Sequence, residues 1–365
     1  MRMIRKFCLI FILLSITILP ACDTNSYTYS IPADLADGWQ VDSLASVNIS
    51  ESLLSEMVDE VQSGRYGFVH SILIIKDDHL VFEKYFNSYT WEMFQDIRSC
   101  TKSVTSTLIG IALDKGYIPS VDARLFSFFP EYQNLNNAQK DKIKLSHVLI
   151  MTSGLEWDEW AYPYNDPRNP WNQMTNTDDW LQFVLSRSCI YEPGERWFYN
   201  SGGSMLLSGI IRNTTGQQAK EFGLQNLFRP LGISEYIWNS NSAGLTMTYS
   251  NLFIRPRDMA KIGYIYINNG EWNGAKILSE EWITEATRDR IMTTSGDAAY
   301  AYQWWKRRYN VNNATVESFS AEGSGENYIF CFDSLKMIVV ITAANWDVWF
   351  NVLDIVPRFI LPSTN

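Results

Sequence analysis

Strand-like segments lie near the two ends of this 365-residue chain, and the region between them is mostly helical in its periodicity. Two such segments lie near the N-terminus and four near the C-terminus, over residues 69–75, 80–86, 300–307, 314–321, 327–333 and 336–343. The polar sequence Lys76-Asp77-Asp78-His79 between the first two suits a hairpin turn. We therefore expect an α+β fold, with an antiparallel sheet assembled from both chain ends and an all-helical region between them.

Apolar spacing and helix-end residues organise the rest of the chain. Helices are expected over residues 50–62, 100–115, 178–187, 201–213, 217–228, 257–268 and 279–289. The amphipathic stretch 346–359 is expected to form a closing helix whose last turn is limited by Pro357. On this pattern, residues 46–120 together with 290–365 form a sheet domain, and residues 121–289 form a helical domain.

The first residues have the features of an export signal. A positively charged start is followed by an apolar stretch, residues 7–19, that is too short to span a bilayer. An alanine then precedes Cys22, as in the lipobox of bacterial lipoproteins, whose cysteine is acylated. The sequence predicts a signal peptide over residues 1–21, lipidation at Cys22 and a tether over residues 22–45. The protein would then be anchored to a membrane of the bacterial cell envelope, outside the cytoplasm. An ordinary secretory signal with an incidental cysteine is the alternative.

The charge and cysteine content exclude several classes of function. The chain has a formal net charge of −10, which repels phosphate backbones, so we expect no nucleic-acid partner. Cys100, Cys189 and Cys331 are odd in number and lack metal-site spacing, so they are expected to be free thiols. The three histidines are also scattered, and we expect no metal and no cofactor.

One serine in the chain is followed three positions later by lysine, in Ser99-Cys100-Thr101-Lys102. At a helix start, positions i and i+3 share a face, so the amine would lie beside the hydroxyl. A neighbouring amine of lowered pKa can take the proton that a serine hydroxyl must lose to become a nucleophile. Lys102 also lies at the start of a strongly apolar helix, and a lysine is seldom buried there unless it has a functional or structural partner. These residues indicate Ser99 as a catalytic nucleophile and Lys102 as its proton acceptor.

The sequence around Ser99 is the first of five motifs in a fixed order. They are residues 99–110 (SCTKSVTSTLIG), 145–155 (LSHVLIMTSGL), 193–201 (PGERWFYNS), 227–233 (LFRPLGI) and 257–263 (RDMAKIG). With these motifs the chain resembles the serine β-lactamase-related hydrolases, which include class C β-lactamases, penicillin-binding proteins, esterases and 6-aminohexanoate-dimer hydrolases. The Trp-rich sequence Tyr302-Gln303-Trp304-Trp305 is most similar to the last branch. The resemblance covers about residues 40–360 and implies a β-lactamase/transpeptidase-like fold.

The resemblance also implies the second part of the site. The family motif Tyr-x-Asn falls on Tyr199-Asn200-Ser201, which makes Tyr199 a third catalytic residue and Ser201 a substrate-binding residue. A phenol close to an ammonium ionises more readily and can accept or return the nucleophile's proton. Ser201 replaces the asparagine of many members, which disfavours recognition of penicillin-type amides.

The third family motif, Lys-Thr-Gly in penicillin-recognising members, falls on a segment without lysine or histidine. Here Gly323, Ser324 and Gly325 are expected to contact the substrate, with a backbone N–H of this segment joining that of Ser99 in an oxyanion hole. Glu322 and Glu326 flank the glycines, and we expect them to disfavour substrates that carry a carboxylate.

These observations predict a serine hydrolase that forms an acyl-enzyme at Ser99 and acts on a small-molecule substrate, either an ester or a linear amide. A cell-wall D-Ala-D-Ala peptidase or β-lactamase is the alternative enzyme. A catalytically silent envelope binding protein on the same scaffold is the alternative without catalysis. The absence of a Gly-x-Ser-x-Gly sequence disfavours an α/β-hydrolase. The sequence does not predict the oligomeric state.

Overall fold

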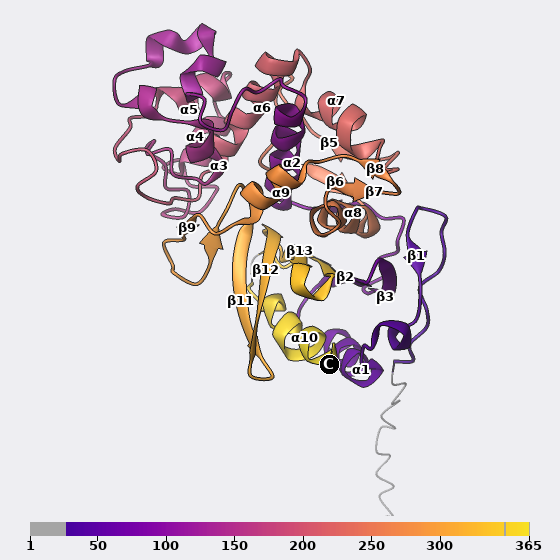
Figure 1. The fold of residues 1–365 in the computed structure, drawn as a ribbon. Helices are drawn as coiled ribbons and strands as arrows, with labels where there is room; N and C mark the ends of the chain where they lie inside the picture. The colour runs from indigo at the N-terminus through magenta and orange to yellow at the C-terminus, as the bar shows by residue number, and fades with distance from the viewer. Residues whose placement is uncertain (1–26, 347, 365) are drawn as a thin grey trace, which may run out of the picture.

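A nine-stranded sheet joins the two ends of the chain in the computed structural model, which describes residues 27–346 and 348–364 (Figure 1). Its strand order is β1-β3-β2-β14-β13-β12-β11-β10-β9. All pairs are antiparallel except the parallel pair β1 and β3. The strands are β1 (Gln40–Val41), β2 (Val69–Lys76), β3 (His79–Tyr85), β9 (Ile291–Met292), β10 (Ala299–Tyr300), β11 (Trp305–Val311), β12 (Ala314–Gly323), β13 (Asn327–Phe332) and β14 (Met337–Ala343).

The pairing of β2 with β14 closes the sheet, because it places residues from the first and last quarters of the chain side by side. Along both strands, alternate side chains enter opposite cores, as the two-residue period of a strand requires. Leu73 and Val340 belong to one core, and Ile74 and Val339 belong to the other. The central strands of the sheet are thus buried on both faces. The sheet is assembled from both chain ends, as the sequence predicts.

Helices cover the two faces unequally (Figure 1). The helices are α1 (Glu51–Gln62), α2 (Cys100–Asp114), α3 (Leu145–Leu149), α4 (Pro170–Thr175), α5 (Trp180–Ser186), α6 (Ser201–Thr215), α7 (Ala219–Gly223), α8 (Pro256–Ile267), α9 (Glu280–Thr287) and α10 (Leu361–Ser363). On one face, α1 packs beside α10. On the other face, α2 packs on β12 and α8 on β13 and β14, and the remaining helices build outward from α2. Two small sheets, β4 (Gln95–Asp96) with β6 (Leu252–Ile254) and β5 (Ile237–Trp238), and β7 (Glu271–Trp272) with β8 (Ala275–Lys276), flank this region.

Two expected elements differ from those observed. The strand expected over residues 300–307 is split between β10 and β11, because Gln303 adopts a φ of +62° and donates its backbone N–H to the Leu149 carbonyl. The closing helix expected over residues 346–359 begins only at Val352. Asn351 has a φ of +56°, and the Glu326 carboxylate accepts the Val352 N–H, so helical structure starts at that point.

Segments at the expected domain boundaries pack as follows. Within the expected tether, the described residues pack on the sheet: the Trp39 indole donates to the Arg257 carbonyl, and Leu44 is buried. Helix α8, expected in the helical domain, lies on the sheet. The expected signal peptide and Cys22 lie outside the described residues. No described helix has the length and apolar character needed to cross a bilayer.

Candidate active site

Ser99 stands immediately before α2, on the side of the sheet that carries the helical region. A serine at this position usually caps its helix, but the Ser99 hydroxyl makes no capping hydrogen bond. The chain turns sharply into the helix, because Arg98 has a φ of +49°. Helix α2 is buried over almost its whole length and packs against β12. The Ser99 hydroxyl is therefore held on a rigid buried element and remains free for chemistry.

Lys102 lies one helical turn after Ser99 and points back to it. Its Nζ lies 3.0 Å from Ser99 Oγ and donates to the Tyr249 carbonyl at 2.9 Å. The side chain is only 2% exposed. Burial lowers the pKa of Lys102 to about 8, although the charge of Glu159 and the Cys100 thiol act in the opposite direction. The lowered pKa makes the neutral amine, which can accept a proton from Ser99, more accessible near neutral pH.

Tyr199 completes the cluster from the turn that precedes α6. Its ring centre lies 4.8 Å from Lys102 Nζ. The rings of Trp160 and Trp305 stack on it, at centroid distances of 5.0 and 6.2 Å. Burial, followed by the charge of Glu159, raises the pKa of Tyr199 far above 10. Burial and the Glu159 charge thus favour the neutral phenol, whereas the neighbouring ammonium was expected to favour ionisation.

The third motif brings backbone against the nucleophile. A Cβ atom on Gly323, the last residue of β12, would lie 2.4 Å from the Ile97 carbonyl oxygen and 3.2 Å from the Ser99 nitrogen. Only glycine fits this approach without moving the backbone. Within the described part of the chain, the N–H groups of Ser99 and Ser324 donate to no other protein group. Gly325 has a φ of +79°, and the chain turns away from Ser99 at this residue. Its backbone packs against the ring of Trp346.

The two glutamates beside this motif are both engaged by other protein groups, and only Glu322 lines the space around Ser99. Glu326 is buried and accepts from the Asn345 amide and the Val352 N–H, so it belongs to the C-terminal segment. Glu322 forms a two-pronged ion pair with Arg307 of β11, with N–O distances of 2.7 and 2.8 Å. The register of β11 and β12 pairs Arg307 with Ser318, so the Arg307 side chain reaches along the same face of the sheet to Glu322. The segment therefore carries a cation that the sequence motif does not show.

Two hollows meet at Ser99. The first, of about 220 Å³, is lined by Arg98, Ser99, Tyr164, Trp171, Ser201, Tyr249, Ser250, Asn251 and Ser324. The second, of about 390 Å³, is lined by Ser99, Trp160, Tyr164, Tyr199, Ser295, Asp297, Trp305, Arg307, Glu322, Gly323, Ser324, Tyr328 and Trp349. Ser99, Ser324 and Tyr164 belong to both. A substrate can therefore extend in two directions from the nucleophile, along a polar wall on one side and an aromatic wall on the other.

Ser201 contacts a residue that the sequence analysis did not identify. Its backbone N–H and its hydroxyl both donate to the carboxylate of Glu159, at 2.7 and 2.8 Å. Glu159 is 1% exposed. The sequence feature that could have indicated Glu159 is its place between tryptophans, in Trp157-Asp158-Glu159-Trp160, because an acid that is buried must have hydrogen-bond partners. Its partner is 42 residues away, and the sequence alone does not place the two together.

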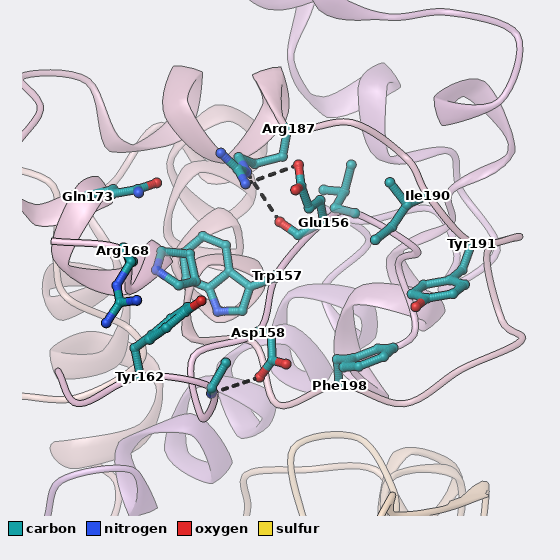
Figure 2. Close-up of a pocket in the computed structure, with 13 residues that line it drawn as sticks. Glu156, Trp157, Asp158, Tyr162, Arg168, Gln173, Arg187, Ile190, Tyr191 and Phe198 are labelled. Carbon is teal, nitrogen blue, oxygen red and sulfur yellow. Dashed lines mark hydrogen bonds and ion pairs between the residues drawn. The ribbon is translucent and has the colours of Figure 1, made fainter. Parts of the chain in front are cut away.

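A larger hollow of about 500 Å³ lies on the other side of the same loop and contains none of Ser99, Lys102 and Tyr199 (Figure 2). Figure 2 shows the Arg187–Glu156 ion pair at its edge and the ring of Trp157 in its wall. Asp158 caps the turn of its own loop by accepting from the Ala161 N–H. Arg168, the other cation in the lining, pairs with Asp166 of the same loop. The nucleophile opens instead onto the two smaller hollows.

Comparison with known proteins assigns this architecture to one family. The family model described as Beta-lactamase matches residues 55–360. A 6-aminohexanoate-dimer hydrolase of Paenarthrobacter ureafaciens is 21% identical, with 70% of this chain and 68% of that protein covered. A protein of Escherichia coli O157:H7, provisionally named a D-alanyl-D-alanine carboxypeptidase, is 21% identical, with 84% and 82% covered.

Among solved structures, a Bacillus anthracis protein provisionally named a 6-aminohexanoate-dimer hydrolase superposes with a TM-score of 0.71. It is 20% identical, and the match covers 85% of this chain and 81% of that one. At this identity the superposition establishes the fold. It confirms the β-lactamase/transpeptidase-like architecture that the motifs implied.

Proposed function

Because the chain belongs to the β-lactamase family of hydrolases, we propose that it is a serine hydrolase that forms an acyl-enzyme at Ser99. The observation that carries the proposal is the 3.0 Å contact between Lys102 Nζ and Ser99 Oγ in a buried setting that lowers the lysine pKa to about 8. A nucleophile, a base of suitable pKa and unpaired backbone donors occur together at the junction of two hollows.

The geometry supports a definite division of labour during acylation. Neutral Lys102 accepts the Ser99 proton as Oγ attacks the substrate carbonyl carbon. One N–H of the Lys102 amine continues to donate a hydrogen bond to the Tyr249 carbonyl. The N–H groups of Ser99 and Ser324 stabilise the resulting oxyanion. Tyr199, held as a neutral phenol, donates a proton to the leaving alcohol or amine, and Lys102 reprotonates it. Water then hydrolyses the acyl-enzyme with Lys102 again as base.

The two hollows favour a small ester or linear amide as the substrate. Together they extend the space on both sides of Ser99. The 390 Å³ hollow is lined by six aromatic residues, Trp160, Tyr164, Tyr199, Trp305, Tyr328 and Trp349. In the D-Ala-D-Ala peptidase or β-lactamase alternative, a cation would receive a substrate carboxylate. Arg307 lines this hollow, but its charge is engaged by Glu322. Neutral substrates are therefore favoured over anionic ones.

A fluorophosphonate probe tests the nucleophile directly. Wild-type protein should be labelled and should hydrolyse a neutral p-nitrophenyl ester, and Ser99→Ala should lose both properties while keeping its thermal unfolding midpoint. Ser106→Ala is the matched control, because Ser106 lies on the same helix and its hydroxyl has no partner within the described structure. Labelling of Ser99→Ala at the wild-type level would refute the assignment. Failure of the wild-type protein to react would favour the silent binding protein.

The place of action is proposed from the N-terminal sequence. Cys22 would be acylated and hold the domain at a membrane of the cell envelope, outside the cytoplasm. The described fold begins packing near residue 29, where the Tyr29 hydroxyl donates to the Val81 carbonyl. Few residues thus separate the proposed anchor from the folded domain, which would keep the hydrolase close to the membrane surface.

A further inference from the structure

Glu159 holds a buried carboxylate at the junction of the aromatic loop and helix α6. Its Oε2 accepts from the Trp157 indole N–H at 2.6 Å and from the Ser201 N–H at 2.7 Å. Its Oε1 accepts from the Ser201 hydroxyl at 2.8 Å and from the Tyr164 hydroxyl at 3.0 Å. All four partners are uncharged, so the carboxylate is solvated by hydrogen bonds in place of water.

Two features of this location favour a negative charge. Ser201 is the first residue of the 15-residue helix α6, and the positive end of the helix dipole points at the carboxylate. Two backbone or indole N–H groups, which can only donate, point at the same oxygen. A buried charge still carries a cost in desolvation, and a neutral side chain could have filled the same space. The charge of Glu159 therefore calls for a role beyond packing.

The carboxylate lies close to the proton-carrying residues, because Ser201 follows Tyr199 by two positions and the Tyr199 ring centre lies 4.8 Å from Lys102 Nζ. The Glu159 charge favours the protonated form of Lys102, and it raises the pKa values of Tyr199 and Tyr164. Through its hydrogen bonds, the same side chain fixes Ser201 and Tyr164, which line the smaller hollow. Trp160, the next residue along the chain, stacks on Tyr199. One carboxylate thus touches both walls of the site and acts on both proton-carrying residues.

We propose that Glu159 is a positioning residue of the hydrolase: its buried carboxylate orders the loop over the site by holding Ser201 and Tyr164, and its charge acts on the Lys102 and Tyr199 side chains beside them. The inference rests on the proposed function, in which Lys102 must be neutral to accept the Ser99 proton. In this arrangement the Glu159 charge favours the protonated forms of both Tyr199 and Lys102, so Tyr199 stays a proton donor. It lines neither of the two hollows and is not itself a catalytic group.

The expected effect on pH dependence has a definite sign. The groups that face Lys102 are the Ser99 hydroxyl, the Tyr249 carbonyl and ring, the Tyr199 ring, the Cys100 thiol and the Glu159 charge. Of these, Glu159 raises the pKa of Lys102 most, ahead of the Cys100 thiol. Neutralising it lowers that pKa further below about 8, so more Lys102 is neutral at a given pH. The rise of kcat/KM with pH should then move to lower pH.

Glu159→Gln tests the proposal with little structural change. The glutamine oxygen can take the place of Oε2 and accept both N–H groups, and its amide can donate to the hydroxyls of Ser201 and Tyr164, which can act as acceptors. Glu156→Gln is the matched control, because Glu156 lies in the same loop and pairs with Arg187 in the separate larger hollow. The acid limb of kcat/KM should shift down by roughly one pH unit in Glu159→Gln and remain in place in Glu156→Gln.

A second measurement separates this proposal from the proposed function. In the Ser99→Ala background, the pKa of Lys102 is followed by 13C NMR of its Cε, with Glu or Gln at position 159. A lower Lys102 pKa with Gln supports the proposal whether or not the wild-type protein hydrolyses any ester. An unchanged Lys102 pKa, with or without loss of thermal stability, would show that Glu159 has a structural role only and would overturn the proposal. Absence of labelling in wild type would instead remove the proposed function.

Discussion

The ion pair between Arg307 and Glu322 should control whether the site accepts a carboxylate. Both guanidinium contacts are short, at 2.7 and 2.8 Å, and the two side chains are only 17% and 12% exposed. Ser320 donates to the same carboxylate. In Glu322→Gln the amide can still accept one N–H, but it carries no charge and opposes the second with its own NH₂ group. Arg307 would then keep one distant acidic partner, Asp297 at 3.4 Å.

The size of the effect follows from the interaction that is exchanged. A hydrogen bond to a charged group contributes about 1.5–3 kcal/mol. The free energy of unfolding of Glu322→Gln should fall by about that amount. A substrate carboxylate that binds Arg307 in the variant should gain a similar binding free energy. Because 1.36 kcal/mol corresponds to a factor of ten, kcat/KM for an anionic substrate should rise by about 10- to 100-fold relative to a neutral one.

The assay compares nitrocefin, which carries a carboxylate, with a neutral p-nitrophenyl ester on the same samples. Wild-type protein should strongly prefer the neutral ester, and the preference should narrow in Glu322→Gln. Glu317→Gln is the matched control, since Glu317 lies on the same strand and pairs with Arg308 at the exposed end. An unchanged ratio between the two substrates in a folded Glu322→Gln protein would refute the reasoning. Efficient nitrocefin turnover by the wild type, on the order of 10⁶ M⁻¹s⁻¹, would favour the β-lactamase alternative.

Two further predictions concern the backbone and the anchor. Gly323→Ala places a methyl group 2.4 Å from the Ile97 carbonyl and should lower kcat by about 10²-fold or more by displacing the oxyanion donors. Gly203→Ala, whose new Cβ would meet its nearest neighbour at 3.4 Å, should retain activity, and equal kinetics for the two variants would contradict the assigned approach. Cys22→Ser should move the protein from the membrane fraction to the soluble fraction, and a variant that stays with membranes in detergent-free buffer would exclude the lipid anchor.

The parts of the site that could be predicted from sequence are those set by local geometry. Ser99 and Lys102 are three residues apart at the start of an apolar helix, so helical periodicity alone brings them together. Tyr199 was placed by resemblance, since 100 residues separate it from Ser99 and no local rule joins them. The sheet could be predicted from the strand patterns near the two chain ends, because the apolar faces of those strands must be buried against other elements.

The parts that could not be predicted depend on distant side chains and on register. Glu322 was expected to repel a substrate carboxylate, yet the pairing of β11 with β12 gives it Arg307 as a partner. Glu326 lies four residues further along and turns to the opposite side, where it caps the C-terminal segment. The direction in which each glutamate points is set by the strand pleat and by the turn at Gly325, neither of which the residue types reveal.

A single buried glutamine fixes the spacing between the two helices that carry the catalytic residues. Gln303 accepts from the Ser103 hydroxyl of α2 through its carbonyl, at 2.6 Å, and from the Ser204 hydroxyl of α6 through its side chain, at 2.7 Å. Its backbone and side-chain N–H groups both donate to the Leu149 carbonyl at the end of α3. The φ of +62° that breaks the expected strand is unfavourable for a residue other than glycine, at roughly 1–3 kcal/mol, and these buried hydrogen bonds offset it. Ser103 follows Lys102 directly, and Ser204 lies one turn into the helix that follows Tyr199. The hydrogen bonds of Gln303 therefore fix the positions of Lys102 and Tyr199 on either side of Ser99.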